Sequence, residues 1–138
     1  MLAATVSIAL LSIPHRSNWV FGWASLLGAF ITGGLIGLRF HQDDFWGGYD
    51  SFRRRIVRLG HIAQAALGII NVVYALSPLP MPGTWQASMA DIAFMIGGVA
   101  MPLVCFLSGW RRPFRHLFFI PVVSLVLAVV FTLWGGVS

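Results

Sequence analysis

Four long apolar segments, separated by short polar connections, make up most of the chain. They cover residues 19–38, 56–76, 89–108 and 117–134. Only Arg58 and Asp91 interrupt them with a charge. At a rise of about 1.5 Å per residue, an α-helix of this length crosses a hydrocarbon layer about 30 Å thick. The alternating pattern typical of a membrane β-barrel is absent. The sequence therefore predicts an all-α integral membrane protein, a four-transmembrane-helix bundle that forms a single transmembrane domain over residues 1–138.

Residues 1–13 form a shorter apolar segment, which Pro14 separates from the first long one. As a helix this segment would be about 20 Å long, which is too short to span a bilayer comfortably. No charged residue precedes Arg16, whereas a secretory signal peptide carries a basic start and a cleavage site. We therefore expect a short N-terminal helix that is interfacial or half-spanning, in preference to a fifth crossing.

The composition supports a membrane environment and excludes several kinds of site. Hydrophobic residues make up 58% of the chain and charged residues 9%, whereas soluble domains have about 25% charged residues. The net charge of +5 comes from arginines at the ends of apolar segments, so it does not indicate nucleic-acid binding. The single cysteine, Cys105, excludes an internal disulfide bond and a cysteine metal cluster. Because the histidines are also not closely spaced, no metal site is expected.

The arginines are distributed unequally between the two sides of the predicted bundle. Eight lie in or next to the connections 39–55 and 109–116, and one, Arg16, lies on the opposite side. Cytoplasmic loops of membrane proteins carry an excess of basic residues, so both connections are predicted to be cytoplasmic and the C-terminus exported. The expected location is an inner (cytoplasmic) membrane of the bacterial type.

Three polar residues of the second segment, His61, Gln64 and Asn71, recur at spacings that place them on one face of a helix. Polar side chains cannot face lipid without leaving hydrogen-bonding groups unpaired. This polar stripe is therefore predicted to be buried and to face the interior of the bundle or a partner. We interpret it as a hydrogen-bonded structural contact between helices, or alternatively as part of a cofactor, quinone or ion site.

Two histidines are candidate axial ligands of a b-type haem. His61 lies about one turn into the second segment, and His116 lies at the start of the fourth. Imidazole nitrogens on two facing helices are what such a haem iron needs. His116, however, stands beside Arg115 at the level of the headgroups, shallower than His61. Haem b is therefore an alternative and not the favoured interpretation, and the cofactor stays unknown.

Asp91, in the third segment, has two interpretations. An intramembrane carboxylate is a candidate functional residue by default. Ser88 and Asp91 also match a capping box, in which the carboxylate would bind the first backbone N–H groups of a helix. We expect the cap, and we do not favour a proton pump because the apolar segments contain no second acid.

The connection after the first segment, residues 40–55 (FHQDDFWGGYDSFRRR), combines aromatic and charged residues. Its aspartates are expected to pair with neighbouring arginines, and Asp50 or Ser51 can cap the following helix. Its aromatic and basic residues are predicted to contact anionic lipid headgroups or a protein partner, together with those of the second basic connection. The residues assigned to this contact are Trp46, Tyr49, Arg53, Arg54, Arg55, Arg111 and Arg112.

Small residues recur every four positions on the first and fourth segments, a pattern that lets helix backbones approach closely. They are Ser25, Ala29, Gly33 and Gly37 on the first segment, and Ser124, Ala128, Thr132 and Gly136 on the fourth. Most of them are expected to pack within the bundle, and the rest against another subunit.

The four segments leave no room for a soluble domain, and the chain contains no catalytic constellation, so an enzyme is not favoured. We expect a small non-catalytic polytopic subunit of a larger bacterial-type membrane complex, with respiratory or photosynthetic electron transfer suspected. Its partners would be other integral membrane proteins and anionic lipid headgroups on the cytoplasmic side. The alternative is a haem-binding or quinone-interacting membrane anchor that uses the face of His61, Gln64 and Asn71. A small transporter or channel is the third hypothesis.

Overall fold

The computed structural model describes residues 13–137 and contains only helices and their connections over that range. Four of its helices are long and apolar enough to cross a membrane, which confirms the predicted all-α fold. They are α2 (Arg16–Gly37), α3 (Phe52–Ala75), α4 (Trp85–Trp110) and the helical segment Arg112–Val137. This last segment consists of the 3-10 helix η1 (Arg112–Phe118) followed by α5 (Phe119–Val137). The N-terminal helix predicted over residues 1–13 falls outside the described residues, except for Ile13.

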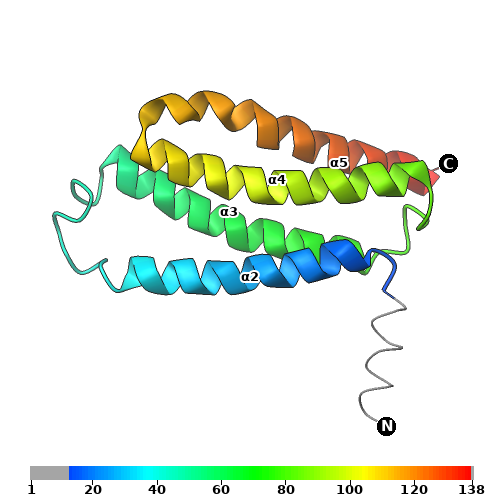
Figure 1. Cartoon of the computed structure of the whole chain (residues 1–138), viewed down its shortest axis with the longest axis horizontal. Coiled ribbons are helices and arrows are strands. Elements are labelled where there is room, and N and C mark those ends of the chain that lie inside the picture. The colour runs from blue at the N-terminus through cyan, green and yellow to red at the C-terminus, as the bar shows by residue number, and fades with distance from the viewer. Residues whose placement is uncertain (1–12, 138) are drawn as a thin grey trace, which may run out of the picture.

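The four helices run antiparallel and lie in a row in the order of the sequence (Figure 1). α3 packs against α2 and α4, and α4 packs against α3 and α5, whereas α2 touches α4 only slightly. Within residues 13–137, α5 makes extensive contacts only with α4. The bundle is therefore open, and its two edge helices, α2 and α5, each have one main neighbour.

The two ends of the bundle differ in character. Residues 38–51 and the turn from α4 into η1 lie at one end, which we call the arginine-rich end (Figure 1). The connection 76–84 and the start of α2 lie at the other end, which we call the proline-rich end. The arginines are grouped at one end because successive helices run in opposite directions, so that the connections after α2 and after α4 lie at the same end.

Helix α4 begins earlier than the sequence predicts. Thr84 Oγ1 accepts a hydrogen bond from the backbone N–H of Ala87 at 3.3 Å and caps the helix. Ser88 and Asp91 lie inside the helix, so the predicted capping box at these two residues is wrong. The cap at Thr84 places the carboxylate of Asp91 about two turns from the start of the helix, where it faces His15, the residue before α2.

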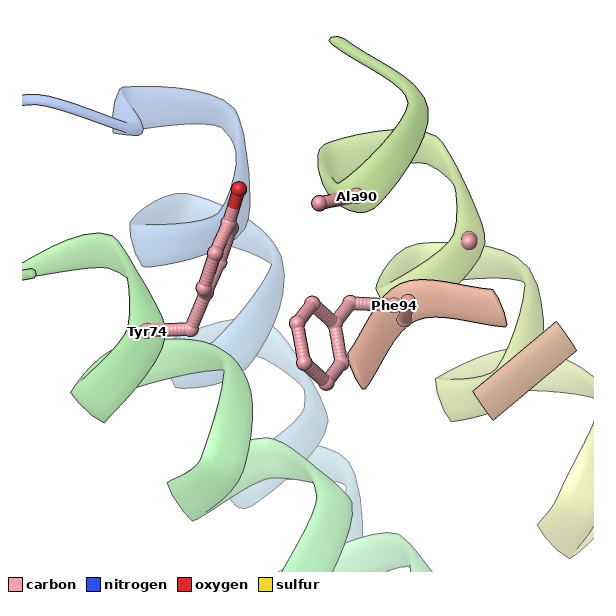
Figure 2. Packing of buried hydrophobic residues seen from close by; sticks show 5 residues of the cluster. Tyr74, Ala90 and Phe94 are labelled. Atoms are coloured by element: carbon pink, nitrogen blue, oxygen red, sulfur yellow. The ribbon is translucent and has the colours of Figure 1, made fainter. Parts of the chain in front are cut away.

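The hydrophobic core lies where α3, α4 and α5 meet (Figure 2). It consists of Tyr74, Ala90, Ala93, Phe94 and Ala128. The ring centroids of Tyr74 and Phe94 are 4.7 Å apart, and the alanines let the helices approach closely. At this short separation Ser124 Oγ donates a hydrogen bond to the backbone oxygen of Ala93, 2.8 Å away.

The small residues of the two edge helices serve mainly to pack the bundle itself. On α2, Ala29 is 2% exposed, and on α5, Ala128 is fully buried. Gly37 and Gly136, the last members of the two series, are open, because a Cβ added there would meet no atom within 4 Å. The expectation that most of these residues pack internally agrees with this arrangement.

The connection between α2 and α3 is folded around Arg54. The Arg54 side chain is only 3% exposed, and it donates hydrogen bonds to the backbone oxygens of Phe40 at 2.8 Å and Gln42 at 3.5 Å. Glycines at 47–48, with φ of +87° and +90°, turn the chain. Ser51 then caps α3, as predicted, by accepting a hydrogen bond from the backbone N–H of Arg54 at 3.2 Å.

Candidate functional site between helices α2, α3 and α4

The polar stripe of α3 faces α2. Thr32 Oγ1 of α2 lies 3.3 Å from His61 Nδ1 and 3.2 Å from Gln64 Oε1, both within hydrogen-bond distance. Ser25 Oγ, nearer the start of α2, donates a hydrogen bond to the backbone oxygen of Gln64 at 3.1 Å. We call Thr32, His61 and Gln64 the His61 cluster. These contacts satisfy polar groups of α3 that lipid would leave unpaired.

Glycines on α2 make room for the side chains of this cluster. A Cβ added at Gly28 would lie 2.6 Å from Gln64 Nε2, and one added at Gly33 would lie 2.7 Å from His61 Cε1. Both distances are shorter than van der Waals contact, so any larger residue would displace the amide or the imidazole. The glycines of α2 therefore accommodate polar side chains as well as the backbone of α3.

His61 also lines a small, mainly apolar cavity of about 220 Å³ near the arginine-rich end. The other lining residues are Gly33, Ile36, Gly37, Phe40, Arg58 and Ile62. Among these side chains, only those of His61 and Arg58 carry polar groups. An apolar cavity with a few polar groups at its rim can hold part of a flat apolar molecule that has a hydrogen-bond acceptor.

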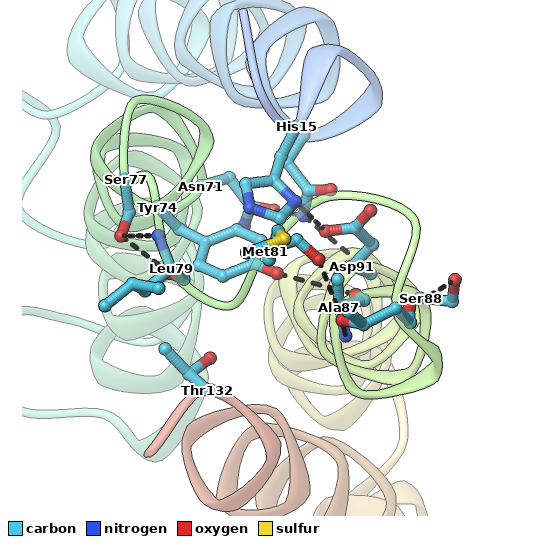
Figure 3. A network of polar contacts seen from close by, with 12 residues as sticks. His15, Asn71, Tyr74, Ser77, Leu79, Met81, Ala87, Ser88, Asp91 and Thr132 are labelled. Atoms are coloured by element: carbon cyan, nitrogen blue, oxygen red, sulfur yellow. Dashed lines mark hydrogen bonds and ion pairs between the residues drawn. The ribbon is translucent and has the colours of Figure 1, made fainter. Parts of the chain in front are cut away.

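A second group of polar contacts lies at the proline-rich end, between α2, α3 and α4 (Figure 3). His15 Nδ1 lies 2.8 Å from Asp91 Oδ1, which is an ion pair when the imidazole is protonated. His15 is 2% exposed, and its ring centroid lies 4.5 Å from that of Tyr74. The backbone N–H of His15 donates to the backbone oxygen of Ala75 at 3.3 Å. The residue before α2 is thus held by both α3 and α4.

Asn18 and Asn71 extend this group about one turn deeper into the bundle. Asn18 Nδ2 donates hydrogen bonds to Asn71 Oδ1 at 2.9 Å and to the backbone oxygen of Asp91 at 3.2 Å. Asn71 Nδ2 donates to the backbone oxygen of Leu67 at 2.8 Å, and both asparagines are fully buried. We call His15, Asn18, Asn71, Tyr74 and Asp91 the His15 cluster.

His15 and Asn18 were not among the predicted site residues, although Asn18 binds Asn71 of the polar stripe and His15 binds Asp91. Their spacing of three residues places both on one face of the first turn of α2. That spacing was the available signal, together with an unpaired Asp91 in the third segment. Only the packing of three helices shows that these residues meet.

The His15 cluster joins three helices, because its members lie at the start of α2, on α3 and on α4. The Asp91 side chain is 26% exposed. His15 Nε2 and Asn18 Oδ1 are buried and have no hydrogen-bond partner within residues 13–137. The other three aspartates belong to the connection at the opposite end of the bundle. The described residues therefore provide no chain of acids that leads from one end to the other.

The residues assigned to a lipid or partner contact lie at the arginine-rich end. The exposed ones are Tyr49, Arg53, Arg55, Arg111 and Arg112, and Trp46 is half-buried. Arg54 differs from its neighbours, because its guanidinium is buried and engaged by the backbone of its own connection. The prediction of a lipid or partner contact therefore applies to the exposed members of this set.

The aspartates of the connection do not pair with arginines as expected. Within residues 13–137, no aspartate oxygen of this connection lies within 4 Å of an arginine nitrogen. The single pair of this kind joins His15 and Asp91 at the opposite end of the bundle. Aromatic rings hold the arginines instead: Arg58 Cζ lies 4.6 Å from the ring centroid of Tyr49. A cation–π contact needs less precise geometry than an ion pair and suits a connection rich in aromatic residues.

The structure does not bring His61 and His116 together. His61 faces α2, whereas His116 is exposed on η1, which packs against α4 and α5. A haem bound by both residues would need two facing helices, and these two elements do not face each other. Among the described residues, no group of three or more His, Cys, Asp or Glu side chains could hold a metal ion.

No protein-family model, curated protein or solved structure matches the chain. Its function is therefore inferred from its own fold and polar clusters.

Proposed function

We propose that this protein is a small non-catalytic subunit that packs into a larger membrane complex and stabilises it. The observation that carries this proposal is the open row of helices. The edge helices α2 and α5 each have one main neighbour, and few of their residues are buried. Phe30, on the exposed side of α2, is 75% exposed. Other spanning helices can pack against these edges without any change in the bundle.

An apolar groove between α2 and α4 supports the same proposal. Its volume is about 430 Å³, and it is lined by Phe21, Met95, Ile96, Val99, Ala100 and Leu103. It forms because α2 and α4 touch only slightly. Gly34 adds an open position on α2, at which a Cβ would meet no atom within 4 Å, so a second backbone can approach there.

We further propose that the complex belongs to an electron-transfer chain, respiratory or photosynthetic, in a bacterial-type inner membrane. The location of eight of the nine arginines at one end supports an orientation with that end in the cytoplasm. The suggestion of electron transfer rests on the His61 cavity, which suits a quinone.

Extraction in a mild detergent followed by native mass measurement tests the subunit proposal. We expect a mass well above 15.1 kDa, with other membrane proteins bound. Gly34→Leu should weaken the association, because the added side chain blocks close approach of a second helix. Gly136→Leu makes the same change at an open position on α5 and shows whether that edge takes part. A well-folded monomer of 15.1 kDa with no protein bound would contradict the proposal and favour the transporter hypothesis.

The His61 cavity favours a second function, that of a membrane anchor that binds a quinone. The imidazole and the Arg58 guanidinium lie at the border of an otherwise apolar space, where they can donate to a quinone carbonyl. Analysis of the same purified sample separates the two functions. If quinone can be extracted from the purified protein but not from the His61→Phe variant, the anchor function is supported. A Soret band that shifts on reduction in the absorption spectrum would instead indicate haem.

A further inference from the structure

A separate polar cavity of about 280 Å³ lies at the arginine-rich end, between the start of α3 and the end of α4. It shares no lining residue with the His61 cavity. The side chains that determine its chemistry are Trp46, Phe52, Arg53, Ser108, Trp110 and Arg112. Two guanidinium groups and the hydroxyl of Ser108, contributed by three different elements, thus border the same space. Ser51 also lines it, but its hydroxyl already donates to the backbone oxygen of Trp46 at 2.8 Å.

Aromatic rings, and not carboxylates, hold the two guanidinium groups. Arg53 Cζ lies 5.7 Å from the ring centroid of Trp46, and Arg112 Cζ lies 5.8 Å from that of Phe52. Within residues 13–137, no carboxylate lies within 4 Å of either arginine. A cation–π contact uses the face of the guanidinium and leaves the N–H groups at its edge able to donate. Both arginines can therefore bind an anion placed in the cavity.

Ser108 provides an independent indication of a ligand. Its side chain is 1% exposed, and its Oγ has no hydrogen-bond partner within residues 13–137. A serine inside a helix usually donates to the backbone of the preceding turn or points to solvent. A buried hydroxyl without a partner costs stability unless a ligand or an ordered water accepts its hydrogen. Since Ser108 lines the cavity, the acceptor that completes it would lie there.

We propose that this cavity binds a phosphate group, with Arg53 and Arg112 as charged donors and Ser108 as a hydroxyl donor. Donors from three different elements suit a tetrahedral oxyanion, and arginine binds phosphate oxygens through paired N–H groups. The cavity lies at one end of the spanning helices, the level at which lipid phosphates are found. The phosphate is carried by an anionic lipid headgroup or by a small soluble ester. This site is independent of the proposed role as a subunit.

Isothermal titration calorimetry of the full chain in an uncharged detergent tests the site. The two probes are dihexanoyl phosphatidylglycerol and glycerol 1-phosphate. Arg53→Gln and Arg112→Gln should each lower the affinity about tenfold or more, because each removes a charge-assisted hydrogen bond. Ser108→Ala should lower the affinity about threefold without any change in charge. As matched controls, Arg39→Gln and Arg115→Gln remove one charge each outside the cavity and should change the affinity less than about twofold.

Binding of either probe with this pattern upholds the proposal. Binding of glycerol 1-phosphate assigns a soluble ester, and binding of the lipid alone assigns a headgroup. Equal losses in all four arginine variants would overturn the proposal, because diffuse attraction of anions to this end would then explain the binding. Absence of binding of both probes to the unaltered chain would also overturn it. Where an arginine variant fails to fold, Ser108→Ala decides, and an unchanged affinity in that variant counts against the site.

Discussion

At the scale of single residues, glycines of α2 determine how closely α2 and α3 approach each other. A Cβ added at Gly22 would lie 2.7 Å from the backbone oxygen of Gly68 and 2.9 Å from the backbone nitrogen of Val72. These neighbours are backbone atoms, so they cannot move aside as a flexible side chain can. Gly34, on the same helix, meets no atom within 4 Å of an added Cβ. The two glycines thus differ only in their surroundings.

Gly22→Ala should therefore destabilise the protein, because the added methyl group forces α2 and α3 apart. We expect the free energy of unfolding to fall by about 1–3 kcal/mol, the usual cost of overpacking a tight interior. Gly34→Ala is the matched control and should be neutral or stabilising by less than about 1 kcal/mol, the difference in helix propensity. Denaturation in mixed micelles, followed by circular dichroism, measures both. Equal stabilities of the two variants would show that this close contact does not form.

At the scale of elements, one inward-facing arginine organises the connection between α2 and α3. Arg54 donates to the backbone oxygen of Phe40, and its Cζ lies 4.5 Å from the Phe40 ring centroid and 5.4 Å from that of Tyr49. The preceding and following residues, Arg53 and Arg55, are exposed. One buried guanidinium thus joins the end of α2 to the start of α3.

Arg54→Gln should loosen this connection without unfolding the helices. The shorter, uncharged side chain cannot reach the Phe40 oxygen, and it loses a charge-assisted hydrogen bond worth about 1.5–3 kcal/mol. We expect faster hydrogen exchange and faster proteolysis over residues 38–51. Arg55→Gln removes the same charge from an exposed neighbour and should leave both rates unchanged. The assignment of Arg54 as the organising residue fails if the two variants behave alike.

The sequence predicts that the four apolar segments are α-helices, and it predicts their approximate bounds. The reason is that a continuous apolar segment in a bilayer must pair its own backbone N–H and C=O groups, as a helix does. The direction of the polar stripe was also accessible: His61, Gln64 and Asn71 share a face by helical geometry alone, and all three contact α2.

The cap of α4, the direction of each arginine and the pairing of His15 could not be predicted. They depend on contacts between helices, or on a choice between two neighbouring residues that are equally suitable. Thr84 and Ser88 are both good caps, and the turn before α4 decides between them. Arg53 and Arg54 have the same side chain, and a rotation of about 100° per residue turns one outward and the other inward. The pairing of His15 with Asp91 joins residues far apart in the chain, so no local pattern reveals it.

At the scale of the whole molecule, polar and apolar contacts are divided along the row of helices. The His61 and His15 clusters join α2 and α3, with α4 contributing Asp91, whereas the core at α5 is mainly alanine and aromatic side chains. Hydrogen bonds specify one geometry. Between α4 and α5 the described residues form one side-chain hydrogen bond, from Ser124 Oγ to the backbone oxygen of Ala93, so the polar contacts are concentrated between α2, α3 and α4.

The distribution of charge over the whole molecule leads to the last prediction, which concerns orientation. Residues 38–51 and the turn from α4 into η1 lie at the same end of the bundle, and together with the adjoining helix ends they contain eight of the nine arginines. Basic residues near the ends of spanning helices favour the cytoplasmic side, and a bias this strong argues against insertion in both directions. Reporter fusions after Gly47 and after Val137 should therefore give opposite signals, cytoplasmic at Gly47 and exported at Val137. A fusion after Met81, in the connection at the proline-rich end, is the control and should match Val137. An exported signal at Gly47 would contradict the orientation, and equal signals at Gly47 and Val137 would contradict the four-helix topology itself.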